Sequence, residues 1–406
     1  MRAGIEALGV YAGRAFIDVN ELAAARGLDV QRLQNLLMRE KTVALPFEDP
    51  VSFAVNAAKP IVDRLSPAER ERIEQLIVAT ESGLDFGKPL ASYIHHFLGL
   101  SRNCRTFEVK HACYAGTAAL QTAAALVHSG VSPGAKVLVI TTDAARPIPK
   151  TYAEPSQGAA AVAMLVGDAP RVLEIEKGMS GCYGFEVMDS CRPTPEIETG
   201  DADLSLLTYL ECIENSFAAY RTKAGDVRFA THFDYLAFHT PFGGMVKGAH
   251  RTMMRKLERV PPAVIEEDFR RRLEPSLRYC ARVGNIYSGT LFLALAGVLE
   301  SGSFDGVPKR VGLFSYGSGC CSEFYSGTAS SESQSAIAAQ QLGRQLDERH
   351  RLSMAEYERL LDTHKLLPFG TQNGEPDDAG FEEHFAGRGL LVLDRIRGYH
   401  REYRWS

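Results

Sequence analysis

One cysteine of the 406-residue chain lies at a position where its sulfur could act as a nucleophile. Cys113 lies in HACYAGTAAL (111–120), after CRTFEVK (104–110), which predicts a strand, and before a run that predicts a helix. The first N–H groups of a helix lack partners and its dipole is positive there, so the position favours a thiolate. Small neighbours such as Ala112 and Gly116 leave room for a substrate carbonyl. A small buried thiol is the alternative interpretation.

Two more polar residues follow apolar runs. Glu81 ends QLIVATE (75–81), and His239 lies in YLAFHTP (235–241). The carboxyl ends of buried strands form the rim where α/β proteins bind ligands. Burial there raises the pKa of a carboxyl, so Glu81 could serve as general acid or base, and His239 could polarise a carbonyl. A capping glutamate and a core histidine are the alternatives.

Three residues are candidates for contact with substrate. Asn285 precedes a predicted helix in GNIYSGTLFLALAG (284–297), where it could bond an acyl group or cap the helix. The glycines of FSYGSG (314–319) allow the backbone close to a thioester carbonyl, which makes Ser318 a candidate oxyanion-hole donor. A tight turn is the alternative there. Tyr114 follows the cysteine directly.

The elements that must position these residues occur in the same order twice. In the first half, nearly continuous apolar strands alternate with helices, and the helix after Cys113 should end at Gly130; this is typical of a sheet buried on both faces. CYAGTAAL and IYSGTLFL share Tyr-x-Gly-Thr, with Cys113 falling on Ile286. We therefore predict an α/β fold duplicated as 1–167, with Glu81 and Cys113, and 168–406, with His239 and Asn285; coincidence is the alternative.

Composition narrows the class of protein. The chain has 45% hydrophobic and 23% charged residues and a net charge of -5, which is ordinary for a globular protein and suggests no nucleic-acid partner. No apolar run long enough for a membrane span and no export signal is present in the sequence. Eight scattered cysteines show no metal-ligand spacing, so we expect reduced thiols, a cytoplasmic protein and no metal site.

Five motifs together resemble the 3-hydroxy-3-methylglutaryl-CoA synthase family. They are ATESGLD, HACYAGTAAL, FHTPFGGMVKGAH, GNIYSG and FSYGSG, and the resemblance runs from GIEALGVY to RIRGYHREYRW. It implies a thiolase-like fold of two related halves in five α-β-α-β-α layers, and a homodimer. It also implies that Cys113 is the acetylated nucleophile, Glu81 the general acid/base and His239 the residue that orients the second substrate. Asn285 and the backbone at Ser318 would line the acyl pocket, with no bound cofactor.

Departures from the mevalonate-pathway motif bear on the substrate. His111 and Ala115 stand in HACYAGT where those enzymes usually read N-A-C-Y-G-G-T, and Gly244 replaces a lysine associated with the nucleotide end of CoA, although Lys247 is close. Residues 38–63 look more like the polyketide branch, whose members act on acyl groups tethered to acyl carrier proteins and install β-branches. The resemblance thus implies donor and acceptor carrier proteins as partners, with phosphopantetheine thioesters as substrates.

An acidic carrier protein would need a basic docking surface. Four basic residues recur at every fourth position, which predicts a stripe along one helix face: Lys247, Arg251, Arg255 and Arg259. The arginines at 270–272 add positive charge, and a solvated helix face is an equally weighted alternative. His250, in the same stretch, could also face the active site and ranks below His239.

Three other functions remain open. A mevalonate-type synthase using acetyl-CoA and acetoacetyl-CoA would share every catalytic residue. A ketoacyl-synthase or thiolase relative would pair Cys with His-His or His-Asn, and the Glu81 motif argues against it. A non-catalytic carrier-binding protein would not need Cys113, Glu81 and His239 together. The sequence does not identify the β-ketoacyl acceptor or distinguish an acetyl from a propionyl donor.

Overall fold

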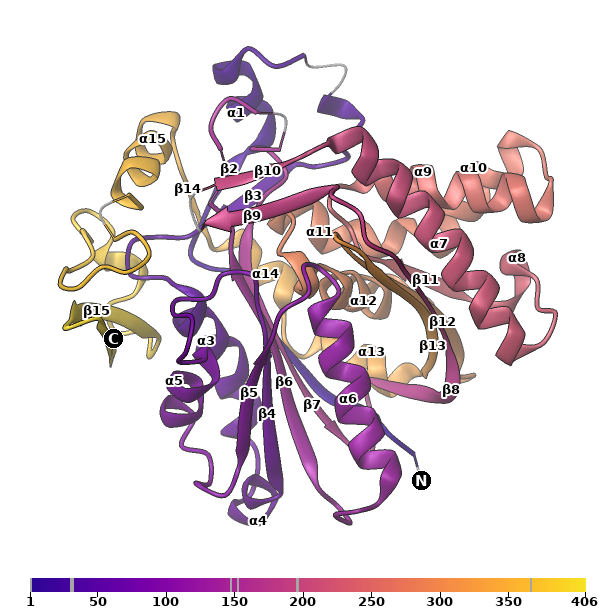
Figure 1. The fold of residues 1–406 in the computed structure, drawn as a ribbon, viewed down its shortest axis with the longest axis horizontal. Coiled ribbons are helices and arrows are strands. Elements are labelled where there is room, and N and C mark those ends of the chain that lie inside the picture. Colours follow the sequence, from indigo (N-terminus) through magenta and orange to yellow (C-terminus); the bar gives the residue numbers. More distant parts are fainter. Residues whose placement is uncertain (1, 30–32, 147, 152, 195–196, 366) are drawn as a thin grey trace.

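A nine-stranded mixed sheet runs through the protein, which we describe from a computed structural model covering residues 2–29, 33–146, 148–151, 153–194, 197–365 and 367–406 (Figure 1). The strands, in spatial order, are β11 (Tyr235–Phe238), β12 (Lys309–Gly317), β13 (Cys321–Ala329), β8 (Leu173–Gly184), β1 (Gly4–Tyr11), β7 (Ala159–Gly167), β6 (Lys136–Ala144), β4 (Ile73–Ala79) and β5 (Arg105–Val109). The strands expected from apolar runs are therefore present. β4 ends at Ala79, so Glu81 lies two residues beyond the strand and does not end it.

The two halves of the sheet repeat one topology. In the first half β1 pairs with β7 and β7 with β6 in antiparallel fashion, and β6 pairs with β4 in parallel. In the second half β8 pairs with β13 and β13 with β12 in antiparallel fashion, and β12 pairs with β11 in parallel. β1 and β8 join the halves. The expected duplication is confirmed, and β5 is an extra edge strand of the first half.

Helices cover both faces of each half. The principal ones are α3 (Pro50–Val62), α5 (Leu90–Phe97), α6 (Ala115–Ser129), α7 (Ala202–Ala224), α9 (Gly243–Met253) and α12 (Thr290–Ser301). α6 and α12 share one buried core between the halves, while α3 with α5, and α7 with α9, cover the outer faces (Figure 1). On β6, Val139 faces the central core and Ile140 the outer one, as the period of two in a strand requires. The layers are α-β-α-β-α, the thiolase-like arrangement expected.

The start of α6 is held tightly against its neighbours. An added Cβ at Gly116 would lie 2.7 Å from Thr141 Cγ2 and 3.0 Å from Phe292 Cε2, so only glycine lets this turn approach β6 and α12 so closely. The helix ends at Gly130, which has φ 63° and closes it in the left-handed conformation, as predicted. The predicted helix at 284–297 begins later, because a 3-10 turn (Tyr287–Gly289) precedes α12.

The C-terminal segment returns to the first half. Its elements and their neighbours are β14 (His350–Arg351), β2 (Ala15–Asp18), β3 (Glu40–Val43), α1 (Val19–Arg26), α15 (Met354–Thr363), β15 (Leu391–Arg397) and β16 (His400–Trp405). β14 pairs with β2, and Asn56 of α3 bonds both backbone groups of Leu391 at 2.8 and 3.1 Å. The boundary between residues 167 and 168 stays a prediction, because the chain after it packs on both halves.

Other elements complete the two halves. They are α4 (Pro67–Glu71), the hairpin β9 (Ser190–Thr194) and β10 (Ile197–Gly200), α8 (Phe229–His232), α10 (Pro262–Arg272), α11 (Leu277–Val283), α13 (Ser331–Ala338) and α14 (Leu342–Asp347). Ser66 caps α4 and Pro67 opens it, as the sequence predicts. Within the described ranges, we find no helix with the length and apolar character needed to cross a membrane.

Candidate active site

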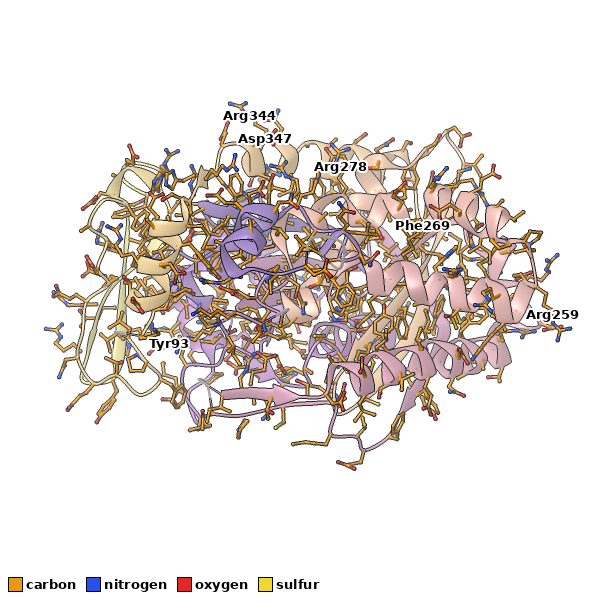
Figure 2. All side chains as sticks on the ribbon, turned by 90° about the horizontal axis from the view of Figure 1, so that it is seen from above. Tyr93, Arg259, Phe269, Arg278, Arg344 and Asp347 are labelled. Carbon is orange, nitrogen blue, oxygen red and sulfur yellow. The ribbon has the colours of Figure 1, made fainter. Side chains whose placement is uncertain are left out.

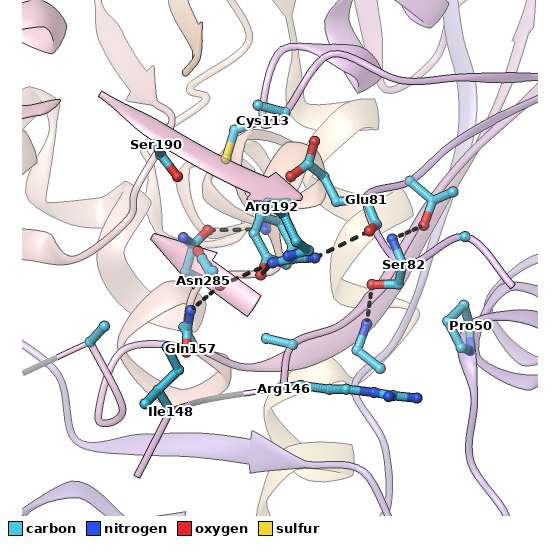
Figure 3. A pocket seen from close by; sticks show the side chains of 18 of the residues that line it. Pro50, Glu81, Ser82, Cys113, Arg146, Ile148, Gln157, Ser190, Arg192 and Asn285 are labelled. Carbon is cyan, nitrogen blue, oxygen red and sulfur yellow. Dashed lines mark hydrogen bonds and ion pairs between the residues drawn. The ribbon is translucent and has the colours of Figure 1, made fainter. Parts of the chain in front are cut away.

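A cavity of about 1380 Å³ lies at the carboxyl ends of the parallel strands. Its wall contains the residues predicted as nucleophile, base and carbonyl-orienting group, together with two of the predicted substrate contacts: Cys113, Glu81, His239, Asn285 and Ser318. Figure 3 shows the Cys113 sulfur and the Glu81 carboxyl facing the same space, behind the β9–β10 hairpin. Residues from both halves of the chain thus meet at one site.

The turn that carries Cys113 is fixed by close backbone contacts. Ala112 has φ 40°, and an added Cβ at Gly317 would lie 2.7 Å from both His111 O and Tyr114 Cβ. The turn therefore rests on the end of β12, in the second half. Such close approach explains why small residues surround the cysteine.

The environment of Cys113 does not lower its pKa, so the predicted stabilisation of a thiolate is wrong. Burial raises the pKa of the thiol well above its ordinary value, and the carboxylates of Glu81 and Asp143 raise it further. The first helical residue is Ala115 with Tyr114 as N-cap, so the sulfur precedes the helix and faces carboxyl groups. Cys113 is held as a thiol beside a base that can accept its proton.

The Glu81 carboxyl is a candidate proton acceptor whose pKa lies above the ordinary value. Burial raises the pKa of its carboxyl, and the Arg192 guanidinium opposes that rise. The carboxylate accepts a hydrogen bond from the Ala112 N–H, which places it beside the residue that precedes Cys113. Its own backbone N–H donates to Asp143 Oδ1 at 2.8 Å. The position of Glu81 is therefore set by two neighbouring strand ends.

Asp143 is a buried carboxyl at this site that the sequence interpretation did not identify. Its Oδ1 accepts hydrogen bonds from Glu81 N at 2.8 Å, Ser82 Oγ at 2.9 Å and Thr80 Oγ1 at 3.2 Å. Burial raises its pKa to about 8. Asp143 ends the apolar run AKVLVITTD (135–143), so the signal that singled out Glu81 was present here too.

Arg192 links the β9–β10 hairpin to the site. It donates from Nη1 to Glu81 O at 3.2 Å and from Nη2 to Glu198 Oε2 at 3.1 Å, and it also bonds the Tyr287 hydroxyl (Figure 3). Gln157 Nε2 donates to the same Glu198 oxygen at 3.1 Å. Sequence reasoning missed this group, because the short hairpin carries no apolar pattern to mark it.

His239 follows β11 directly and is 1% exposed. Burial lowers its pKa to about 3, so the imidazole is neutral at physiological pH. Its backbone is held by Phe314 O, which accepts its N–H at 2.8 Å, and by the Tyr209 hydroxyl, which donates to its carbonyl at 2.8 Å. Among the described residues, its Nδ1 has no hydrogen-bond partner. A neutral imidazole in the wall of the cavity can hold a ketone oxygen.

Asn285 and Ser318, both from the second half of the chain, line the cavity. Asn285 Oδ1 accepts hydrogen bonds from Tyr287 N at 3.0 Å and Thr290 Oγ1 at 3.1 Å, so its oxygen supports the turn before α12. The loop at Ser318 is anchored by Asp189, whose Oδ1 accepts the Gly319 N–H at 3.0 Å. Asn285 therefore has a structural task in addition to any contact with substrate.

Tyr114 and His250, two predicted substrate contacts, do not line the cavity. The Tyr114 hydroxyl donates to Glu323 Oε2 at 2.9 Å, so this side chain points along α6 toward β13. His250 is fully buried, and its Nε2 lies 2.7 Å from Asp268 Oδ1. Both predictions failed for one reason: adjacency in sequence to a site residue does not fix the direction of a side chain.

The stripe predicted from basic residues at every fourth position is interrupted. α9 ends at Met253, a π-helical turn (Met254–Glu258) follows, and Arg259 is left-handed with φ 53°. Since a π turn changes the angular step per residue, Arg255 and Arg259 are not in line with Lys247. Figure 2 shows Arg259 at one end of the molecule. Of the arginines at 270–272, the third is fully buried and paired with Asp268, so it adds no surface charge.

Carboxyl groups and the Arg192 guanidinium surround Cys113. Among the residues that the structure describes, no group of three or more His, Cys, Asp or Glu is arranged to hold a metal ion. Carboxyl groups raise the pKa of Cys113, and Arg192 is the cation nearest to them in the hydrogen-bond network. The arrangement can add a thiol to an acyl carbonyl and remove a proton from the bound acyl group.

Comparison with known proteins agrees with this geometry. The hydroxymethylglutaryl-coenzyme A synthase N-terminal family matches residues 1–170, and the C-terminal family matches residues 250–376. The chain is 53% identical to the polyketide biosynthesis 3-hydroxy-3-methylglutaryl-ACP synthase PksG of Bacillus subtilis, over 99% of both chains.

Solved structures give the same result. The curacin biosynthetic pathway HMG synthase in complex with holo donor-ACP is similar with TM-score 0.98 and 55% identity, covering 100% of both chains. MvaS in complex with 3-hydroxy-3-methylglutaryl coenzyme A is similar with TM-score 0.87 and 33% identity, covering 100% of this chain and 99% of that one. The protein belongs to the hydroxymethylglutaryl-CoA synthase family.

Proposed function

We propose that the protein is an acyl-carrier-dependent HMG synthase of polyketide β-branching. It condenses an acetyl group held on Cys113 with the β-ketone of a β-ketoacyl thioester on a carrier protein. The observation that carries this proposal is the meeting of Cys113, Glu81 and His239 in one cavity. The greater identity to PksG and the curacin enzyme than to MvaS supports a carrier-dependent over a mevalonate-type reaction.

The first step is transfer of acetyl to the enzyme. The Cys113 sulfur adds to the carbonyl of an acetyl-phosphopantetheine thioester while Glu81 accepts the thiol proton. The carbon–sulfur bond to the carrier then breaks, and the carrier thiol leaves with that proton. Backbone N–H groups at Cys113 and Ser318 are the proposed donors to the carbonyl oxygen. Because the pKa of Cys113 is raised, a nearby base should speed this step.

The second step forms the carbon–carbon bond. Glu81 removes a proton from the methyl group of acetyl-Cys113, and the enolate adds to the β-carbon of the acceptor. Neutral His239 donates a hydrogen bond to the ketone oxygen, which becomes an alkoxide and takes the proton that Glu81 removed from the methyl group. Water then cleaves the Cys113 thioester, so the product keeps its carrier and gains a carboxylate.

Gly244 supports the preference for a carrier over CoA. An added Cβ there would lie 1.9 Å from Asn35 O, and the Gly244 N–H donates to Leu36 O at 3.2 Å. No side chain fits at this position without movement of the 35–36 backbone. A lysine contact to the nucleotide of CoA is therefore not available at position 244, which matters less for a substrate delivered on a phosphopantetheine arm.

Carrier docking is proposed at the exposed face of α9 and the π turn after it. Arg251 and Arg255 are exposed there, and Phe242 and Met245 at the start of α9 line the cavity. Lys247 is paired with Glu266 at 2.9 Å, and Arg259 lies farther along the chain, so we assign the main contacts to Arg251 and Arg255. An acidic carrier protein is attracted to such a surface.

The same proposal includes an oligomeric state and a cellular compartment for the protein. Strand β5 has only β4 as a sheet neighbour among the described residues, and Phe107 and Val109 on it are only partly buried. An edge strand of this kind can pair with a second copy, so we propose a homodimer. All eight cysteines are free thiols, which fits a reducing cytoplasm.

The test compares donors on one enzyme preparation. We expect acetyl-carrier to acetylate Cys113 with a higher kcat/KM than acetyl-CoA, and acetoacetyl-carrier then to yield the HMG-carrier product, both followed by mass spectrometry. Arg251→Glu should weaken acetylation by the carrier while acetylation by a small thioester persists, and Arg64→Glu, at an exposed residue beyond the far end of α3, is the matched control. A preference for acetyl-CoA would contradict the carrier-dependent function and favour the mevalonate-type reaction.

A further inference from the structure

The cavity wall extends well beyond the reacting groups, to residues near the start of α3 and after Glu81. We call this the distal arm and define it by the side chains that line it: Pro50, Gly83, Leu84, Phe86, Leu367 and Phe369. We call the part of the wall formed by Leu36, His239, Phe242 and Met245, near the start of α9, the proximal arm. The transfer of acetyl and the condensation need only the junction of the two arms.

Hydrogen bonds connect the distal arm to the reaction centre. The segment that follows Glu81 is tied to Asp143 through Ser82 Oγ, which donates at 2.9 Å. The Thr142 hydroxyl, one residue earlier, donates to Pro50 O at 2.6 Å. The arm therefore starts beside Glu81 and passes the first turn of α3.

The outer end of the distal arm lies at the surface and carries two aromatic rings. The rings of Phe86 and Phe369 are 5.0 Å apart in an edge-to-face contact, and Phe86 is 94% exposed. Phe86 and Phe369 thus form an aromatic pair in the cavity wall at this end. Figure 3 shows Pro50 and Arg146 on the side of the pocket that leads away from Cys113.

The size of the cavity exceeds what the smallest substrates need. Pockets for drug-sized ligands usually have about 300 to 1000 Å³, whereas this cavity has about 1380 Å³. An acetyl group and an acetoacetyl group add only a few carbon atoms to the phosphopantetheine arm. The extra space is available for a longer acyl chain.

We propose that the distal arm binds the part of the β-ketoacyl acceptor beyond its β-carbon, so that the enzyme is built for long, mainly apolar acyl chains. This proposal rests on the proposed function, because it states where the far end of that reaction's acceptor binds. The acceptor ketone lies between His239 and Cys113, and its thioester points into the proximal arm toward α9. The fourth carbon and those after it must then leave past Glu81, where the distal arm begins.

Exposed acidic side chains at the outer end bear on where the carrier protein docks. Asp85, Glu375 and Asp377 lie in this part of the cavity wall and are exposed. Acidic residues there disfavour docking of an acidic carrier protein, so the carrier approaches from the other arm. Two arginines also line the cavity: Arg401 is paired with Asp49 at 3.1 Å, and Arg146 lies on the side that leads away from Cys113.

Gly83 gives a direct way to narrow the distal arm. An added Cβ at this glycine has Glu108 Oε1 as its nearest neighbour at 3.5 Å, so a side chain can grow into the cavity without a backbone clash. Gly87 is the matched position in the same segment: its added Cβ also has a nearest neighbour at 3.5 Å, and it does not line the cavity. Phe369→Ala offers a second, milder change that removes apolar surface without adding bulk.

The experiment measures kcat/KM for acetoacetyl-carrier and for 3-oxooctanoyl-carrier on acetylated enzyme. Since each buried methylene contributes about threefold to fourfold, we expect wild type to favour the longer acceptor by at least about tenfold. Gly83→Phe should lower that ratio by about tenfold or more and Phe369→Ala by about threefold, while Gly87→Phe leaves it unchanged. Acetylation of Cys113 shows that each variant is folded.

The outcomes separate the two proposals. Equal loss for both acceptors in Gly83→Phe, or a ratio that neither Gly83→Phe nor Phe369→Ala changes, overturns the distal-arm assignment. If Gly83→Phe does not accept acetyl, the ratio measured for Phe369→Ala decides alone. Failure of wild type to condense acetoacetyl-carrier would instead contradict the proposed function.

Discussion

The contact between Tyr114 and Glu323 should be needed to position the nucleophile. The Tyr114 hydroxyl and Gln121 Nε2 each donate to the Glu323 carboxylate at 2.9 Å, and Glu323 is 3% exposed. Tyr114 is the N-cap of α6 and follows Cys113 directly. The two bonds therefore tie the nucleophile turn of the first half to β13 of the second.

The expected magnitude follows from the chemistry of these bonds. A hydrogen bond to a charged, buried acceptor contributes about 1.5 to 3 kcal/mol. Tyr114→Phe removes one such bond, and Glu323→Gln weakens both while keeping the shape of the side chain. Each change should lower the free energy of unfolding by about 2 kcal/mol and slow acetylation of Cys113 by about tenfold. The double variant should lose at least about 1 kcal/mol less than the sum of the two.

The assay is single-turnover acetylation of Cys113 followed by mass spectrometry, together with denaturant unfolding of each variant. Gln121→Leu is the control, because it removes the other bond to Glu323 from the second turn of α6. It should lower stability while acetylation stays within about twofold of wild type. Strict additivity of Tyr114→Phe and Glu323→Gln, or unchanged acetylation in both, would refute the reasoning.

Three further predictions concern the same site. His239→Ala should keep acetylation of Cys113 and slow condensation by about 10² to 10³-fold, measured as HMG-carrier formed from pre-acetylated enzyme, because only the second step needs a donor to the ketone. Burial lowers the pKa of His239 to about 3. Between this pH and about pH 6.5, the unfolded chain therefore binds a proton that the native imidazole does not. Stability should then fall as pH drops below about 6.5, by up to about 1.4 kcal/mol per pH unit, and denaturant titrations at pH 7 and 5 should show a shallower fall in His239→Asn. Because the Glu81 carboxylate raises the pKa of Cys113, Glu81→Gln should shift the pH profile of Cys113 alkylation to lower pH, and an unchanged profile would contradict that coupling.

The order of strands and helices and their duplication could be predicted where each element carries a local sequence pattern. Apolar strands alternate with capped helices along the first half, and the Tyr-x-Gly-Thr match revealed the repeat that the sheet topology confirms. Cys113, Glu81 and His239 each follow an apolar run, so the sequence could place them at one edge of the sheet. Parallel strands bring such ends together even when they are far apart in the chain.

Predictions failed where the outcome depends on side-chain direction or on burial. The π turn after α9 changes the register of the basic residues, and no residue type in MRKLE marks it. Arg192 reaches Tyr287, 95 positions away, from a hairpin without an apolar pattern. The pKa of Cys113 depends on carboxyl groups that surround it only in the folded protein. These are tertiary contacts, and local propensity does not encode them.

The central claim is that Glu81 removes a proton from an acetyl group held on Cys113, and deuterium exchange tests it most directly. Enzyme acetylated in D₂O is digested, and the Cys113 peptide is weighed by mass spectrometry. In wild type the acetyl methyl should gain deuterium, whereas in Glu81→Gln the cysteine should be acetylated, at a lower rate, without gaining it. Absence of acetyl on Cys113, or equal deuterium gain in both proteins, would contradict this mechanism.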